Sequence, residues 1–261
     1  MTHLLGQGIF DLGQFEFRDW EPAKDASANN GPLCNINAPH IDPSKIVIGV
    51  ESSSDSGIEW RFGPSQHIGA MSPQLLYRTT TAALSNSFLT VIPRSQTSLL
   101  RDVDLVARMF TPNARHKSML HIYQGWVIAR LASLRQHDYY MAAIYRNDTD
   151  TSDVGSIWRV SCGSRIFKIA ATFLGNRIEW TKPWHCRLNL NGNALKAKWW
   201  SYDVIEPQPW DLSGSDNFFA QAGMLGFAAT VHGAIANNIW GLDWYAWSSD
   251  PDVSAPIYPC D

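Results

Sequence analysis

One hairpin-like stretch restricts the fold of this chain more than any other segment. Residues 184–210 read WHCRLNLNGNALKAKWWSYDVIEPQPW, with an Asn-Gly pair between two runs in which apolar and polar residues alternate. Asn-Gly is a strong short-range signal for a two-residue β-hairpin turn, and alternation with a period of two places successive side chains on opposite faces of a strand. We therefore expect an antiparallel hairpin whose apolar face lies on a core.

Alternation predicts the two faces of this hairpin but leaves its register open. A turn at Asn191-Gly192 places Leu188 opposite Leu195, and a turn one residue later shifts the pairing by two and keeps both faces. The core face is predicted to carry Trp184, Cys186, Leu188, Leu190, Leu195, Ala197 and Trp199. The solvent face is predicted to carry His185, Arg187, Asn189, Lys196, Lys198 and, by strict alternation, Trp200.

Strand-like segments at short spacing extend the same pattern along the chain. They are SFLTVIP, LLRDVDLVARMF, MLHIYQGWVIARL, YYMAAIYR, SIWRVSC and RIFKIAATFL, separated by turn-rich sequences such as RNDTDTSDVG. In LLRDVDLVARMF the apolar residues alternate with Asp102, Asp104 and Arg108, which predicts a strand with one solvent-exposed face. Long helical periodicity is missing, and the 12 tryptophans favour strands. The sequence therefore predicts an all-β sandwich or barrel.

The chain divides by composition into three parts. Residues 1–45 are rich in Gly, Asn, Asp and Pro, and we interpret them as an extended N-terminal arm for assembly contacts. Residues 46–250 carry the strand pattern and form the predicted body, and residues 251–261 form a C-terminal tail.

Charge and hydropathy exclude several classes of function. The net charge is −3 and no run of Lys or Arg occurs, which argues against nucleic acid as the main partner. No apolar run approaches the roughly 20 residues of a membrane span, and the first residues lack the pattern of a signal peptide. We therefore expect synthesis in a cytoplasm. Cys162 and Cys186 are interpreted as separate buried thiols rather than as a disulfide.

The order of the motifs resembles a known family. The hairpin is followed by E-P-x-x-W, then by A-G-x-x-G-F, then by a closing strand that contains an Asp; these motifs comprise Glu206, Pro207, Trp210, Ala222, Gly223, Gly226, Phe227 and Asp243. Over roughly Leu75 to Trp247 this order resembles the concanavalin-A-like (laminin-G-like) jelly roll, in the versions found in minor tail proteins of long-tailed bacteriophages. The resemblance implies two packed antiparallel sheets, a virion location at the tail tip, other tail proteins as partners, a homo-oligomer and binding of a host glycan.

Carbohydrate binding would use aromatic faces with hydrogen-bonding groups beside them. The candidates lie where the strand pattern stops or on the expected outer face of the last strand: Trp200, Tyr202, Glu206, Trp210, Tyr245 and Trp247. The alternative for each aromatic residue is ordinary packing in the core, because large aromatic side chains bury well.

A calcium site is the one metal site that the sequence suggests, and no other cofactor is expected. Its candidates are clustered in RNDTDTSDVG: Asn147, Asp148, Asp150 and Asp153. Hard cations bind clustered oxygen ligands of this kind. The loop lacks a bidentate Glu at the usual distance, however, and Asp and Asn also serve as ordinary turn residues.

Catalytic patterns are weak, so we expect the chain not to be an enzyme. Glycosidases use two carboxylates that face each other across the sugar. The expected Glu-x-Asp-x-x-Glu string does not occur; its nearest relative is EFRDWE, with Glu16, Asp19 and Glu21 in the arm. Two alternatives stay open: a glycan hydrolase whose acids come from separate strands, and a purely architectural tail subunit.

Overall fold

The computed structural model describes residues 46–52, 58–64, 73–79, 86–93, 99–110, 123–133, 138–146, 153–161, 164–178, 183–232 and 239–255. These ranges contain fourteen strands and no helix. The predicted arm, residues 1–45, lies outside them, as do residues 256–261 of the predicted tail. None of the described residues forms a helix with the length and apolar character needed to cross a membrane.

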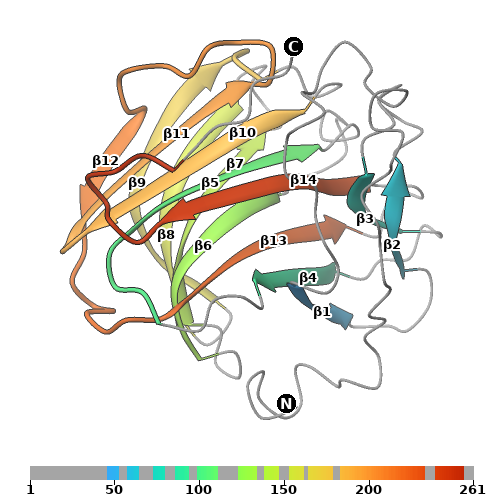
Figure 1. Ribbon diagram of the computed structural model, residues 1–261, viewed down its shortest axis with the longest axis horizontal. Helices are drawn as coiled ribbons and strands as arrows, with labels where there is room; N and C mark the ends of the chain where they lie inside the picture. Colours follow the sequence, from blue (N-terminus) through green and yellow to red (C-terminus); the bar gives the residue numbers. More distant parts are fainter. Residues whose placement is uncertain are drawn as a thin grey trace.

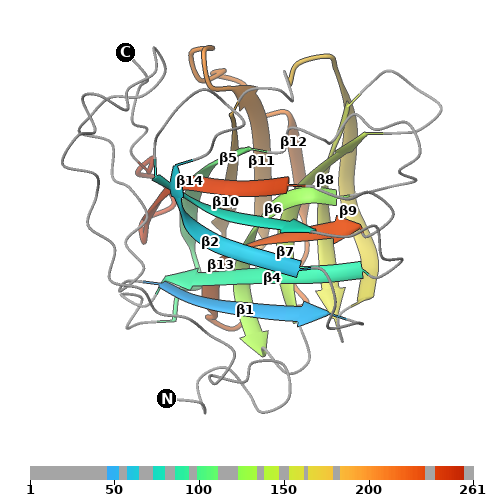
Figure 2. The ribbon, with the colours of Figure 1, turned by 90° about the vertical axis from the view of Figure 1, so that its right-hand side faces the viewer.

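The strands form two seven-stranded sheets (Figure 1, Figure 2). The first sheet has the order β1 (Ile46–Ser52), β4 (Asn86–Pro93), β13 (Met224–His232), β6 (Tyr123–Ser133), β7 (Asp138–Arg146), β8 (Asp153–Ser161), β9 (Ser164–Gly175). The second has the order β12 (Leu212–Ser215), β11 (Ala194–Ser201), β10 (Trp184–Asn191), β5 (Val103–Phe110), β14 (Ile239–Ser248), β3 (Pro73–Thr79), β2 (Ile58–Pro64).

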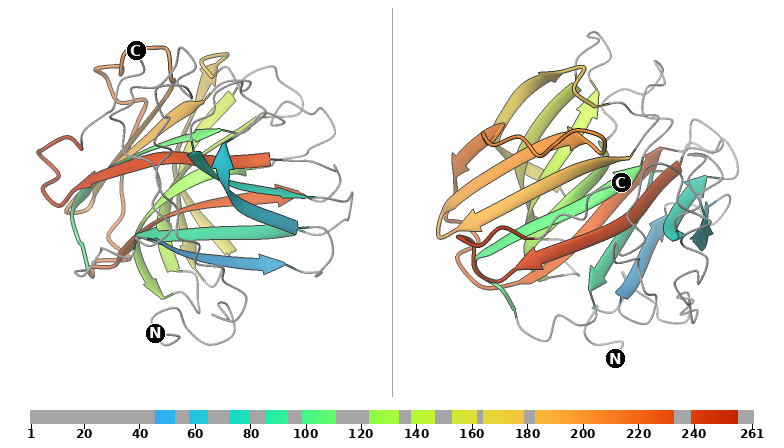
Figure 3. Two further views of the ribbon diagram at one scale, coloured as in Figure 1. Left: turned by 45° about the vertical axis from the view of Figure 1, so that its right-hand side comes forward. Right: turned by 45° about the horizontal axis from the view of Figure 1, so that its top comes forward.

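Neighbouring strands pair in the antiparallel sense in both sheets. Figure 3 shows the two layers from further sides, with β10, β5 and β14 running side by side in the second sheet. This arrangement confirms the predicted all-β, two-sheet antiparallel sandwich of the jelly-roll class. The short edge strand β12 of the second sheet lies against the edge strand β9 of the first.

The hairpin of β10 and β11 has the later of the two registers that alternation allowed. Asn191 pairs with Ala194 and Leu190 with Leu195, so the turn residues are Gly192 and Asn193. Gly192 has a φ of +59°, the left-handed value that the first central residue of a type II′ turn requires. Because the shift is two residues, the predicted core face is unchanged and is buried.

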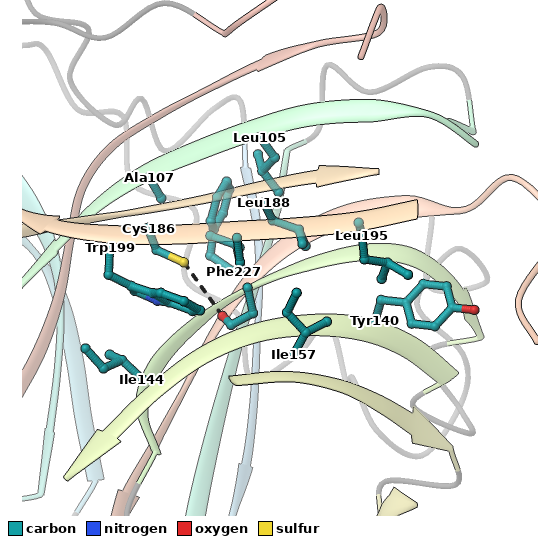
Figure 4. Packing of buried hydrophobic residues seen from close by; sticks show 14 of the residues in the cluster. Leu105, Ala107, Tyr140, Ile144, Ile157, Cys186, Leu188, Leu195, Trp199 and Phe227 are labelled. Carbon is teal, nitrogen blue, oxygen red and sulfur yellow. Dashed lines mark hydrogen bonds between the residues drawn. The ribbon is translucent and has the colours of Figure 1, made fainter. Parts of the chain in front are cut away.

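The core lies between the sheets and is built from that face of the hairpin (Figure 4). Cys186 and Trp199 are paired neighbours on β10 and β11, and both point toward the first sheet. Cys186 is a free, buried thiol, as predicted, and its Sγ lies 3.8 Å from the Ala142 carbonyl oxygen. Burial raises the pKa of this thiol. Cys162 lies outside the described residues.

Trp199 fits into the sandwich because the facing position on β8 is a glycine. A Cβ added to Gly155 would lie 2.5 Å from Cζ3 of the Trp199 indole, closer than real Cβ atoms approach other atoms. The indole therefore occupies the space that a side chain on β8 would fill.

Replacing Gly155 with alanine should therefore overpack the core. We expect Gly155→Ala to lower the free energy of unfolding by about 1–3 kcal/mol, as overpacking substitutions do, measured by denaturant unfolding. If the indole causes this loss, Trp199→Phe should relieve part of it in the double variant. Strictly additive losses would show that the contact with Trp199 is not the cause.

Candidate functional site

The outer face of β10 and β11, which points away from the first sheet, is covered. Three polar side chains on this face donate hydrogen bonds to backbone carbonyls of two non-strand segments, residues 202–211 (the cover loop) and residues 249–255 (the C-terminal segment). Arg187 Nη2 lies 2.7 Å from Ala255 O, Asn189 Nδ2 lies 2.7 Å from Pro251 O, and Lys198 Nζ lies 2.8 Å from Pro207 O.

This cover corrects the prediction of a solvent-exposed hairpin face. His185, Arg187 and Lys198 are all buried, and among the predicted solvent-face residues of the hairpin Lys196 is exposed. Alternation separates two faces of a strand, but it does not reveal what another segment places over one of them. The prediction was right about which residues share this face and wrong that the face is open to solvent.

Arg187 and Asp104 form the buried centre of this face. Arg187 Nη1 lies 2.9 Å from Asp104 Oδ1, which also accepts a hydrogen bond from Ala255 N at 2.9 Å. Asn189 Nδ2 donates to Asp104 Oδ2 at 3.0 Å. Burial raises the pKa of Asp104, and the positive charge of Arg187 with the two hydrogen bonds acts in the opposite direction. Asp104 is therefore buried and paired, which corrects its predicted place on an exposed strand face.

Lys198 brings three of the predicted carbohydrate-binding residues together. Its ammonium lies 2.6 Å from Glu206 Oε1, 4.7 Å from the ring centroid of Trp210 and 6.0 Å from that of Trp200. Glu206 Oε1 also lies 2.9 Å from Arg187 Nε. Glu206 and Trp210 are partly exposed, with 21% of the Glu206 side chain accessible. The cover loop thus holds a carboxylate and an indole against one buried ammonium.

Trp200 lies beneath this surface rather than on it. Only 1% of Trp200 is exposed, and its ring stacks on His185 with 4.8 Å between ring centroids and 15° between planes. It packs with Val106, Ala246 and Ala255 in a small cluster on the outer face. The predicted exposure of Trp200 is wrong because the C-terminal segment covers it, so its ring offers no open face to a sugar.

Tyr245 and Trp247 lie on the opposite face of β14 from the one predicted. A bulge between Leu242 and Trp244 inserts one residue into the pairing of β14 with β5, and this reverses the alternation beyond it. Both residues are therefore partly buried and pack against the main core. The ring centroids of Tyr245 and Phe227 are 4.7 Å apart. Tyr202, the remaining candidate, is partly exposed in the cover loop.

The other predicted groups fall partly outside the described residues. Of the calcium candidates, Asn147, Asp148 and Asp150 are outside them, and Asp153 is a buried residue at the start of β8. Across the part of the chain that the structure describes, no group of three or more His, Cys, Asp or Glu side chains could hold a metal ion. Glu16, Asp19 and Glu21 of the EFRDWE string also lie outside it.

Asp102, the other acid of the predicted strand, serves the hairpin turn. Its Oδ1 accepts a hydrogen bond from Gly192 N at 2.7 Å and lies 3.3 Å from Arg130 Nη2. Arg130, a buried residue of β6 with a positive φ of 51°, also donates to the carbonyl oxygens of Arg101 and Phe219 at 2.6 and 3.0 Å. Asp102 and Asp104 are thus each paired with a buried arginine.

Comparisons with known proteins give similarities at low sequence identity. No protein-family model and no curated protein sequence matches the chain. Among solved structures, the potassium-bound carbohydrate recognition domain of Emp46p matches 80% of this chain and 90% of its own, with 9% identity and a TM-score of 0.48. The Ca²⁺- and mannose-bound exoplasmic domain of VIP36 matches 76% and 84%, with 12% identity and a TM-score of 0.46.

Two further solved structures belong to other kinds of protein. The CBM2 module of the evolved Dit of Lactobacillus casei BL23 phage J-1 matches 78% of this chain and 95% of its own, with 14% identity and a TM-score of 0.43. Xylan β-1,4-xylosidase from Bacillus halodurans C-125 matches 67% of this chain, with 12% identity and a TM-score of 0.44. The match covers 32% of that chain, so this protein spans about a third of the length of the xylosidase.

The buried His185 makes the stability of the covered face depend on pH. Burial, with the positive charges of Arg108 and Arg187 as smaller contributions, holds the pKa of His185 well below its usual 6.5. The unfolded chain therefore takes up a proton near pH 6.5 that the folded chain does not bind. The free energy of unfolding therefore has its full value above pH 6.5 and decreases as the pH falls below 6.5.

We expect the wild type to lose about 1.4 kcal/mol of unfolding free energy per pH unit below about pH 6.5, relative to a His185→Gln variant. The measurement is denaturant unfolding of both proteins from pH 7.5 to pH 5. The comparison removes the titration of the remaining histidines and carboxylates, which both proteins share. Parallel stability curves for the two proteins would show that His185 is not the titrating group.

Proposed function

We propose that this chain is a non-catalytic carbohydrate-binding protein of a bacteriophage virion, a minor tail or tail-tip subunit that attaches the particle to a host-cell glycan. The observation that carries the carbohydrate-binding part is the grouping of Trp210 and Glu206 on the Lys198 ammonium. The order of sequence motifs, which resembles that of tail proteins, supports the virion part.

The chemistry of this surface suits a sugar ring. The apolar face of a sugar can pack on a partly exposed indole, while its hydroxyl groups form hydrogen bonds with charged and polar side chains at the ring edge. The exposed Asp203 and Gln208 and the partly exposed Tyr202 lie in the same loop and supply such groups. Because Lys198 is buried and bound to Glu206 and Pro207, the indole and the carboxylate are positioned before a ligand arrives.

Assembly in the tail forms the second part of the proposal. Residues 1–45 would contact neighbouring tail proteins, and the body would form a homo-oligomer at the tail tip. Electron cryomicroscopy of the virion with an antibody against this chain tests the position. Label at the distal tip supports host attachment, whereas label in an internal ring supports the purely architectural alternative.

The Trp210→Ala variant tests the glycan-binding surface. We expect it to weaken retention on immobilised bacterial cell-wall polysaccharide about tenfold, the effect of losing a contact worth about 1.4 kcal/mol. Ile205→Ala is the matched control, since Ile205 is an apolar residue of the same loop with 90% of its surface exposed. Equal retention by Trp210→Ala and wild type would exclude Trp210 from the site.

The same incubation separates binding from hydrolysis. Chain length of the soluble polysaccharide is measured before and after exposure to the protein. Retention with unchanged chain length supports the proposal, shortened chains support the glycan hydrolase, and no retention leaves the architectural role.

We also propose that a calcium ion binds the segment of residues 147–153, through Asn147, Asp148, Asp150 and Asp153. If it binds there, millimolar CaCl₂ should raise the midpoint temperature of unfolding and an excess of EDTA should reverse the change, because a ligand of the folded state stabilises it. Asp150→Asn should reduce the shift. An identical midpoint in CaCl₂ and EDTA would exclude the site.

A further inference from the structure

A second aromatic surface includes the residues that follow β12, whereas the cover loop precedes this strand. Phe218 follows β12 in the chain, and Phe167 lies on the edge strand β9. Both rings are packed against one guanidinium: Arg159 Cζ lies 4.2 Å from the Phe218 centroid and 5.1 Å from the Phe167 centroid. The two phenylalanines are nevertheless 60% and 48% exposed. We call Phe167, Arg159 and Phe218 the aromatic–arginine cluster.

The position of Phe218 is held by a buried carboxylate. Asp216 Oδ1 accepts hydrogen bonds from Phe218 N at 2.8 Å and from Tyr140 Oη at 2.7 Å, and Asp216 Oδ2 accepts one from Arg159 Nη1 at 3.1 Å. Only 7% of the Asp216 side chain is exposed. Burial, more than the hydrogen bond to Asp216, raises the pKa of Tyr140 to about 12, so this hydroxyl remains protonated and donates.

The neighbouring Phe219 shows that the exposure of Phe218 is built into the loop. Phe219 is buried, and its ring meets Tyr140 edge to face at 5.2 Å between centroids. Its backbone N–H donates to Tyr140 Oη at 3.0 Å, and its carbonyl accepts from Arg130 Nη1 at 3.0 Å. With Phe219 anchored in this way, Phe218 is directed outward. Rigid exposed aromatic groups of this kind are typical of binding surfaces, because little order is lost on binding.

The charge of the aromatic–arginine cluster selects the class of ligand. Asp216 neutralises Arg159 at 3.1 Å, so the cluster is not a site for a free anion such as phosphate. It offers two exposed apolar rings beside the Arg159 guanidinium, whose side chain is 19% exposed, while the buried carboxylate of Asp216 holds that guanidinium in place. Uncharged rings that carry several hydroxyl groups match both features, since their apolar face packs on an aromatic ring and their hydroxyls bond to charged planar groups.

We infer that the aromatic–arginine cluster is a second carbohydrate-binding subsite, which binds the same polysaccharide as Trp210. This inference rests on the proposed function. Trp210 and Phe218 flank β12, which is four residues long, and β12 lies against β9, which carries Phe167. An extended polysaccharide that crosses this edge of the sandwich can contact both surfaces, whereas a short oligosaccharide contacts one at a time. Linked contacts of this kind raise the overall affinity for the long chain.

Three phenylalanine variants test the second subsite. Phe218→Ala and Phe167→Ala should each weaken retention on long cell-wall polysaccharide about tenfold, and either one combined with Trp210→Ala should weaken it further. Phe173→Ala is the matched control, because Phe173 lies on the same edge strand and is 68% exposed. Phe218→Leu keeps the apolar volume without the ring and should behave like Phe218→Ala. Unchanged melting temperatures establish that the variants fold.

The outcomes separate the two proposals. In one outcome, Trp210→Ala retains less polysaccharide, whereas Phe218→Ala and Phe167→Ala retain as much as the Phe173→Ala control. This outcome overturns the second subsite alone. Retention that falls in the phenylalanine variants and not in Trp210→Ala supports the second subsite and overturns the first. If the wild-type protein is not retained on immobilised cell-wall polysaccharide, both proposals are overturned.

Discussion

The covered face of the second sheet depends on the contacts of Arg187. One guanidinium reaches Asp104 on the neighbouring strand, Glu206 in the cover loop and the backbone carbonyl of Ala255 in the C-terminal segment. A buried ion pair adds little net stability, because removing two charges from water costs about as much as their attraction returns. Losing one partner, however, costs about 3–5 kcal/mol, because the other charge is left buried without compensation. The pair therefore specifies where the two covering segments lie more than it strengthens the fold.

The cover loop links this buried network to the surface. Glu206 shares its carboxylate between Arg187 and Lys198, and Lys198 in turn lies against Trp210. The position of the partly exposed Trp210 indole is thus coupled through Lys198 and Arg187 to the interior of the sheet. The aromatic–arginine cluster has a similar arrangement after β12 in the chain, where Asp216 joins Tyr140 and Arg159 to the backbone of Phe218.

Sequence patterns predicted the structural features that depend on residues close together in the chain. The sandwich, the hairpin and the members of its two faces follow from the period of two and from the turn residues, which act within a few positions of each other. The cover over Trp200 was missed because it depends on contacts such as the one between Arg187 and Ala255, which are 68 positions apart. Tyr245 and Trp247 were placed on the wrong face because no residue of IWGLDWYAW marks the bulge. Phe218 and Phe219 are chemically identical neighbours, so contacts with residues distant in the sequence distinguish the two rings. Tyr140 and Arg130 anchor Phe219 inward, whereas the backbone of Phe218 binds Asp216.

The thiol of Cys186 has a consequence for the chemistry of the folded chain. It lies between the two sheets, and burial raises its pKa, so it remains protonated there. A protonated sulfur is a poor nucleophile, and oxidants and alkylating reagents react with the thiolate. In the native sandwich Cys186 does not react with oxidants or alkylating reagents. It becomes reactive in molecules whose two sheets have separated. The fold therefore protects the Cys186 sulfur from oxidants in the surroundings while the two sheets stay together.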